Sequence, residues 1–166
     1  MEGKYLVINS GSSSVKFTLY EMPNTSIIAK GNVERIGKDG CSWLIKYGTN
    51  KISAKADFKN HYEAIDTILK KLGDINIIDN PNDIKGVGFR VLHGGTLYSD
   101  SVLIDDKVVE DIKMLTPLGP LHHPGAIAGI ECVQKLLPKT PKVAVWDTAF
   151  HQTMWCKALW FSWNKP

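Results

Sequence analysis

The stretch Asn9-Ser10-Gly11-Ser12-Ser13-Ser14-Val15-Lys16 links two segments with the character of β-strands. Tyr5 to Ile8 is a short apolar run, and Val15, Phe17 and Leu19 then alternate with polar residues, which predicts a strand with one buried face. The small residues between them would let the backbone approach a phosphate closely, and their hydroxyl and N–H groups can donate to it. The spacing differs from that of a Walker loop, and the same composition is also typical of an ordinary turn.

Downstream of this hairpin the sequence predicts further strands. We predict strands near residues 26–36, 43–47 and 51–55, because glycine and asparagine separate three strand-like stretches. The period then changes at His61 to helical spacing, and Gly73 lies where that helix is expected to stop.

The second half of the chain alternates strands with helices. The pattern predicts strands over 86–92 and 142–146, and helices near 105–115 and 125–137. Antiparallel strands followed by strands that alternate with helices indicate an α/β domain with a mixed sheet.

Composition excludes several classes of protein. Hydrophobic residues make up 43% and charged residues 22% of the 166 residues, and the formal net charge of +3 comes from scattered lysines, which argues against a nucleic-acid binder. Cys41, Cys132 and Cys156 lie far apart without metal-ligand spacing, as expected of reduced thiols in an intracellular protein. No apolar run has the length of a signal peptide or a membrane span, so we expect a cytoplasmic protein with no membrane partner.

A second candidate segment is Gly88-Phe89-Arg90-Val91-Leu92-His93-Gly94-Gly95. An arginine on an apolar strand is costly unless it has an anionic partner, and its planar fork suits a carboxylate or a phosphate. That partner is either a bound anion or an Asp or Glu of the protein itself. We interpret His93 as a structural, hydrogen-bonded histidine.

Two further segments complete the set. Pro117-Leu118-Gly119-Pro120-Leu121-His122-His123-Pro124-Gly125 predicts a rigid loop before a helix, since adjacent histidines rarely converge on one metal ion. Asp147 closes the strand over 142–146, where open α/β sheets place their ligands. It could orient a metal or a ligand, or it could cap the following turn.

These four segments, in this order, resemble the acetate kinase family, and the resemblance covers nearly all of residues 4 to 154. It implies an actin-like, ribonuclease H-like domain with a mixed sheet, the amino-terminal half of a two-domain enzyme. It also implies reversible phosphoryl transfer from ATP to acetate, giving ADP and acetyl phosphate, with Mg²⁺. By matched position it implies Asn9 at the Mg²⁺; Ser12, Ser14 and Lys16 at the ATP phosphates; Arg90, Leu92 and Leu121 at acetate; and Asp147 as the catalytic acid or base.

The role implied for Asp147 needs a chemical check. A carboxylic acid with a pKa of about 4.3 is already ionised at neutral pH, so acetate needs no base to attack phosphorus. Phosphoryl transfer depends mainly on positioning and charge neutralisation. We therefore hypothesise that Asp147 chiefly orients Mg²⁺ or its water shell.

The sequence also departs from the family pattern. Gly119 stands where the family usually has Ala, and His123 stands where it usually has Asn. After Met154 the pattern is lost, so we expect a family domain over 1–154 and an atypical aromatic-rich tail over 155–166. Full-length members form homodimers and close two domains around their substrates, so we expect this chain to be inactive alone. A propionate or butyrate kinase, and a non-catalytic module that binds acyl phosphate or phosphate, remain as alternatives.

Overall fold

The predicted hairpin forms the middle of the sheet. β1 (Gly3–Ser10) pairs antiparallel with β2 (Ser14–Met22), so that Asn9 lies opposite Lys16. On β2, Val15, Phe17 and Leu19 are buried while Lys16 is exposed, which confirms the alternation expected of a strand with one buried face.

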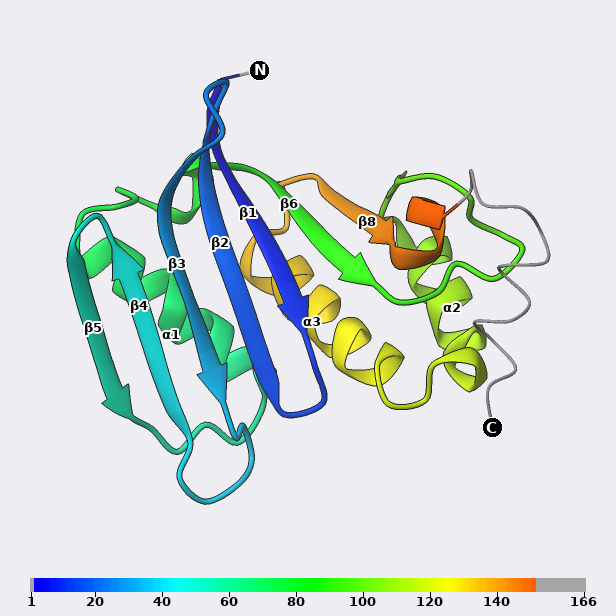
Figure 1. Ribbon diagram of the computed structural model, residues 1–166, viewed down its shortest axis with the longest axis horizontal. Coiled ribbons are helices and arrows are strands. Elements are labelled where there is room, and N and C mark those ends of the chain that lie inside the picture. The colour runs from blue at the N-terminus through cyan, green and yellow to red at the C-terminus, as the bar shows by residue number, and fades with distance from the viewer. Residues whose placement is uncertain (1, 152–166) are drawn as a thin grey trace.

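The computed structural model describes residues 2–151, and in them one mixed sheet runs in the order β5-β4-β3-β2-β1-β6-β8-β7 (Figure 1). β1 to β5 are successive antiparallel strands, whereas β6 is parallel to both β1 and β8. The remaining strands are β3 (Ser26–Glu34), β4 (Ser42–Tyr47), β5 (Asn50–Lys55), β6 (Ile84–Val91), β7 (Val102–Leu103) and β8 (Lys142–Trp146).

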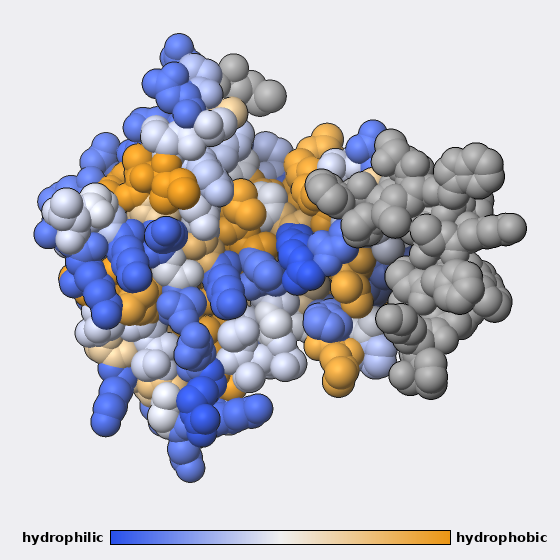
Figure 2. All heavy atoms as spheres, viewed as in Figure 1, coloured by the Kyte–Doolittle hydropathy of each residue, from blue (hydrophilic) through white to orange (hydrophobic). Residues whose placement is uncertain are grey.

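Helices cover one side of this sheet. Figure 1 shows the two longer helices behind the strands, where they pack on each other, and α2 packs against α3. The helices are α1 (His61–Asp74), α2 (Asp106–Met114) and α3 (His123–Leu136), with short 3₁₀ turns η1 (Pro81–Asp83), η2 (Thr116–Leu118) and η3 (Asp147–His151). On the other side of the sheet, Val7 and Val145 remain 43% and 48% exposed. Figure 2 shows hydrophilic and hydrophobic side chains mixed over this face.

The structure corrects some predicted boundaries. Gly73 does not end α1, because the helix continues to Asp74 and the left-handed backbone that follows belongs to Asn76, with φ 55°. Asparagine tolerates this conformation better than most residues, so it can replace the expected glycine. α3 begins two residues earlier than expected, at His123, with Pro124 in its first turn.

Two further sequence predictions concern membrane spans and the carboxyl-terminal tail. Within residues 2–151, no helix is both long and apolar enough to span a membrane. The predicted tail, residues 155–166, lies outside the described residues, as does Cys156.

Candidate functional site

Three parallel strands bring the predicted polar residues to one edge of the sheet. Ile8 lies beside Phe89, and Arg90 lies beside Val145, so the next residue of β1, Asn9, is brought level with Arg90. Asp147 directly follows β8. The carboxyl ends of adjacent parallel strands are where open α/β sheets bind ligands, which makes this edge the candidate site.

Arg90 and Asp147 form an ion pair at this edge. Arg90 Nε donates to Asp147 Oδ1 at 2.9 Å, and Arg90 Nη2 donates to Oδ2 at 2.5 Å. The pair is therefore bidentate, the geometry in which a guanidinium best recognises a carboxylate. The two side chains are 47% and 35% exposed, so the pair is open to exchange with solvent anions. Of the two alternatives that the sequence left open for Arg90, the protein's own carboxylate is the one observed.

The polar loop between β1 and β2 is held in a tight turn. Gly11 N–H donates to the Ser14 carbonyl at 2.8 Å, and the Gly11 carbonyl lies 2.7 Å from His61 Nε2. α3 also packs directly against the loop, because a methyl carbon on Gly125 would lie only 2.4 Å from the Gly11 carbonyl carbon. Only glycine permits this approach. Ser12 is exposed and Ser14 is partly exposed.

Lys16 lies next to this loop on the face of the sheet without helices. It is exposed, and it lines a hollow of about 330 Å³ together with Lys30, Lys46 and Leu44. In the described residues Lys16 makes no ion pair. Its ammonium group is thus available to an anion bound near the loop.

The two predicted apolar residues lie on neighbouring loops. Leu92 follows β6, and its side chain reaches the segment 119–123, where a methyl carbon on Gly119 would lie 3.1 Å from Leu92 Cδ2. Leu121, in the same segment, is 78% exposed. His123 is completely buried there, and burial lowers its pKa, although the nearby Ile112 carbonyl acts in the opposite direction.

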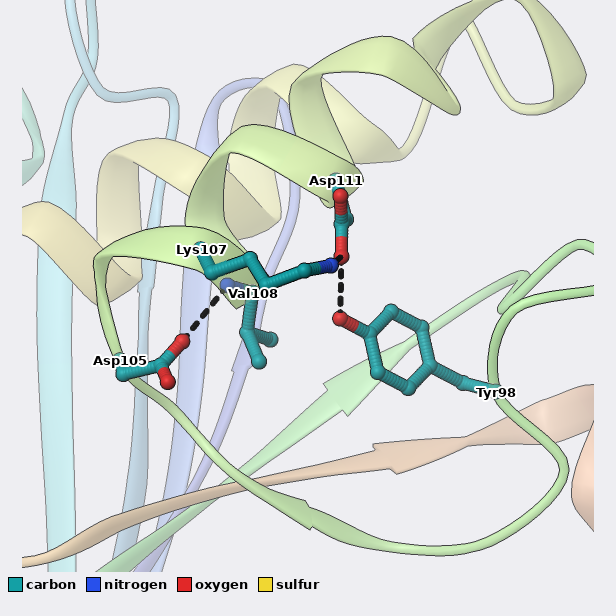
Figure 3. A network of polar contacts seen from close by, with 5 residues as sticks. All are labelled: Tyr98, Asp105, Lys107, Val108 and Asp111. Carbon is teal, nitrogen blue, oxygen red and sulfur yellow. Dashed lines mark hydrogen bonds and ion pairs between the residues drawn. The ribbon is translucent and has the colours of Figure 1, made fainter.

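A polar network fixes the loop that follows Leu92. Tyr98 donates from its hydroxyl to Asp111 Oδ2 at 2.5 Å, and Lys107 Nζ donates to the same oxygen at 2.6 Å (Figure 3). The Tyr98 ring stacks on Trp146, with 4.8 Å between the ring centroids. Trp146 is the last residue of β8, so this stacking, together with the Tyr98–Asp111 hydrogen bond, links the end of β8 to α2.

The network also shifts the pKa of its members. Burial and the bond to Asp111 raise the pKa of Tyr98 to about 12. The bonds from Lys107 and Tyr98 lower the pKa of the Asp111 carboxyl. Both shifts favour the ionised carboxylate and the protonated phenol, the two forms that this hydrogen bond requires.

Sequence reasoning missed some of the supporting residues. His61 and Gly125 hold the polar loop but come from distant helices, and nothing in their local sequence pointed to Gly11. His93 is hydrogen-bonded as predicted, since its Nδ1 accepts from Gly95 N–H at 2.6 Å. Residues 2–151 contain no group of three or more His, Cys, Asp or Glu side chains arranged to hold a metal.

A protein-family model describes the same chain. The model of the acetokinase family matches residues 4–165. The chain belongs to the acetokinase family. It is 51% identical over 152 residues to an acetate kinase of Exiguobacterium sibiricum and 46% identical over 151 residues to one of Bacillus anthracis. Each alignment covers 91% of this chain and 38% of the relative, so the chain spans well under half the length of these curated relatives.

Solved structures of this family share the fold. The acetate kinase of Porphyromonas gingivalis superimposes with a TM-score of 0.87 at 39% identity, covering 92% of this chain and 39% of that protein. A propionate kinase of Francisella tularensis superimposes with a TM-score of 0.84 at 37% identity, covering 92% of this chain and 38% of the other. The mixed-sheet domain predicted from sequence is therefore confirmed as the amino-terminal domain of the acetokinase fold.

Proposed function

We propose that this chain forms the acyl- and phosphate-binding part of an enzyme that transfers a phosphoryl group between ATP and acetate. The observation that carries the proposal is the bidentate pair of Arg90 with Asp147. A guanidinium that already holds a carboxylate in two parallel hydrogen bonds is shaped to hold the carboxylate of acetate. Kinship to the named acetate kinases supports the same reading.

Arg90 would orient acetate by exchanging one carboxylate for another. As acetate approaches, its oxygens replace those of Asp147 on the guanidinium, and Asp147 is released towards Asn9. Arg90 then fixes one acetate oxygen in place while the other attacks phosphorus, and it neutralises charge that accumulates around the transferring group. Leu92 and Leu121 would flank the methyl group of acetate.

Two residues at this edge of the sheet offer oxygen ligands that suit Mg²⁺. Asp147 and Asn9 offer a carboxylate and an amide oxygen, and Mg²⁺ usually takes one or two such ligands and keeps several waters or phosphate oxygens. When bound, the ion would neutralise phosphate charge. Asp147 would orient it or its waters, and this assigns Asp147 a positioning role, with no need to remove a proton from acetate.

The polar loop and Lys16 would hold the phosphates of ATP. The hydroxyls of Ser12 and Ser14, the loop N–H groups and the Lys16 ammonium all lie around one turn. Such a set can bind phosphate oxygens without a Walker loop. The adenosine, the remaining charge on the phosphoryl group and the partner subunit of a dimer would be contacted by the portion of the relatives that this chain does not span.

A longer acyl substrate is the second candidate. The structural similarity to a propionate kinase, at a TM-score of 0.84, is the observation that favours it. The segment around Leu92 decides between acetate and propionate, because the length of the acyl chain is read by the apolar wall and the carboxylate by Arg90. A module that only binds acyl phosphate is the third candidate, and it predicts binding without turnover.

Binding of acetate and acetyl phosphate to the 166-residue chain tests the proposal. We would titrate ¹⁵N-labelled chain with each anion and follow the backbone amides of the polar loop and of residues 90–95 and 147. Arg90→Ala should abolish the shifts, while Arg35→Ala, which removes the other arginine, should leave them intact. Equal shifts in both variants would show that the anions bind elsewhere.

A further inference from the structure

We propose that Gly119 and His123 act together as a specificity-determining pair that sets the position of Leu92, and with it the size of the acyl pocket. This inference rests on the proposed function for the identity of the pocket. The structure brings the two positions into contact.

A side chain at position 119 would lie close to three atoms of His123 and Leu92. A methyl carbon on Gly119 would lie 3.0 Å from His123 Cδ2, 3.2 Å from His123 Nε2 and 3.1 Å from Leu92 Cδ2. Protein interiors pack at crystal-like density, so such a methyl group could be accommodated only if a neighbour moved by a few tenths of an ångström. The bulk of the histidine and the absence of a side chain at 119 therefore compensate each other.

The two neighbours differ in their freedom to move. His123 is fully buried at the start of α3, whereas Leu92 is partly exposed on the loop after β6. Added volume at 119 should therefore displace Leu92 outwards, into the acyl pocket of the proposed function. Removed volume at 123 should let Leu92 settle inwards and enlarge that space.

The chemistry of His123 supports a role in filling space. The backbone of Ile112 acts on the ring as a weak hydrogen-bond partner, and within the described part of the chain neither ring nitrogen makes a hydrogen bond of standard geometry. A buried polar group with so little hydrogen bonding is destabilising, and an apolar side chain would fill the same volume at a lower cost in free energy. What the ring supplies at this position is a rigid planar volume against Gly119.

The size of the expected effect follows from hydrophobic pockets in general. One methylene group in a tight pocket changes discrimination by about tenfold or more. We expect Gly119→Ala to weaken butyrate relative to acetate by about tenfold, and His123→Asn to strengthen it by a few-fold. In the double variant the shorter asparagine makes room for the methyl group, so the ratio should return close to that of the wild type.

The experiment is a double-mutant cycle on the whole 166-residue chain. Dissociation constants for acetate, propionate and butyrate are measured by NMR titration for the wild type, both single variants and the double variant. Urea unfolding of the same four proteins measures their coupling in stability. Gly73→Ala is the matched control, because its added methyl group would meet only the Ile78 carbonyl at 4.0 Å. Arg90→Ala reports on the carboxylate site itself.

The ratio of butyrate to acetate affinity separates the outcomes. A merely structural role would change stability and weaken all three acids alike, leaving the ratio unchanged. A ratio that falls in Gly119→Ala and recovers in the double variant supports the inference. Binding that depends on Arg90 but shows an unchanged ratio overturns the inference and leaves the proposed function standing. If the wild type binds none of the acids, both are overturned.

Discussion

Asp147 binds the guanidinium of Arg90, the group that is expected to bind the carboxylate of a substrate. Both of its oxygens accept hydrogen bonds from Arg90, and under the proposed function they take the place of the acetate oxygens. Because both partners are partly exposed, the pair contributes little to stability, typically about 0–1 kcal/mol. A weak internal pair is well suited to exchange, since it keeps the fork of Arg90 oriented without competing strongly with a ligand.

Replacing Asp147 tests this exchange. Asp147→Asn keeps the shape of the side chain but removes its charge, so Arg90 should bind acetate about two- to fivefold more tightly in the 166-residue chain. NMR titration with acetate measures the change. Asp66→Asn removes a carboxylate paired with Lys70 on α1, and it should leave acetate binding unaltered. Weaker binding in Asp147→Asn would mean that Asp147 cooperates with Arg90 in holding the anion.

The buried His123 makes stability depend on pH. Burial is the main cause of its lowered pKa, and burial together with His123 lowers the pKa of the adjacent His93. An unfolded imidazole has a pKa of about 6.5, so below that pH the unfolded chain binds more protons and the native state loses stability.

His123→Asn should flatten this dependence. Above about pH 7 the two proteins should respond equally to pH, and between pH 6.5 and 5 the wild type should lose stability more steeply, by up to about 1.4 kcal/mol per pH unit for each proton. Urea unfolding across this range measures the difference. Parallel curves for the two proteins would show that His123 is protonated without cost.

Sequence reasoning reached these residues but left their partners open. The position of Arg90 on an apolar strand predicted an anionic partner. That partner lies 57 residues further along the chain, and the parallel pairing of β6 with β8 brings the two together. The contact between Gly119 and Leu92 was equally hidden, because packing between loops leaves no periodic trace in a sequence.

Along the sheet, three lysines from neighbouring strands lie side by side. Lys30 is directly opposite Lys46, and Lys46 is directly opposite Lys51. All three are exposed on the side without helices, and like charges in directly opposed positions destabilise a sheet. Within residues 2–151 none of them has a carboxylate within ion-pair distance.

Reversing the central charge should therefore stabilise the sheet. Lys46→Glu replaces two repulsive cross-strand contacts with attractive ones, and we expect a gain of about 0.5–1.5 kcal/mol at low salt. The gain should shrink at 1 M salt, where the screening length is about 3 Å. Lys55→Glu is the control, because Lys55 lies opposite Ser42. Equal gains in both variants, measured by urea unfolding, would point to net charge as the cause.

The link between α2 and the end of β8 can be weakened selectively. Tyr98→Phe keeps the ring that stacks on Trp146 but removes the hydroxyl that donates to Asp111. Loss of a hydrogen bond to a charged group should cost about 1–2 kcal/mol in the free energy of unfolding. Tyr62→Phe, on the exposed part of α1, should cost much less. If both variants unfold alike, the hydroxyl of Tyr98 contributes nothing to stability.

Secondary structure was predictable where the pattern was long. The alternation over β2 and the helical spacing of Ile65, Ile68, Leu69 and Leu72 on α1 each reflect one buried face, which is a property of the sequence itself. β7 was not predicted, since two residues form no pattern and the strand exists only because it pairs with β8. The exact start of α3 depended on contacts of its first turn with distant loops.

As a whole, the described domain presents an open edge and an open sheet face. The cavities of about 930 and 550 Å³ are lined by residues of α2, α3 and α1 and their flanks, away from Arg90 and Asp147. Arg90 and Asp147 are themselves 47% and 35% exposed, so excluding water from the proposed phosphoryl transfer there requires a second layer. The relatives are longer by a portion that could supply it, since 91% of this chain covers only 38% of their length.

A chimaeric enzyme tests the central claim most directly. Residues 4–151 would replace the matching segment of the Exiguobacterium sibiricum acetate kinase, and formation of acetyl phosphate from ATP, acetate and Mg²⁺ would be measured beside the Arg90→Ala variant of the same chimaera. We predict substantial activity that Arg90→Ala lowers by at least about a hundredfold, as expected for loss of a substrate-orienting group. A folded chimaera that is inactive, or one that is indifferent to Arg90→Ala, would contradict the assignment of this edge as the acetate site.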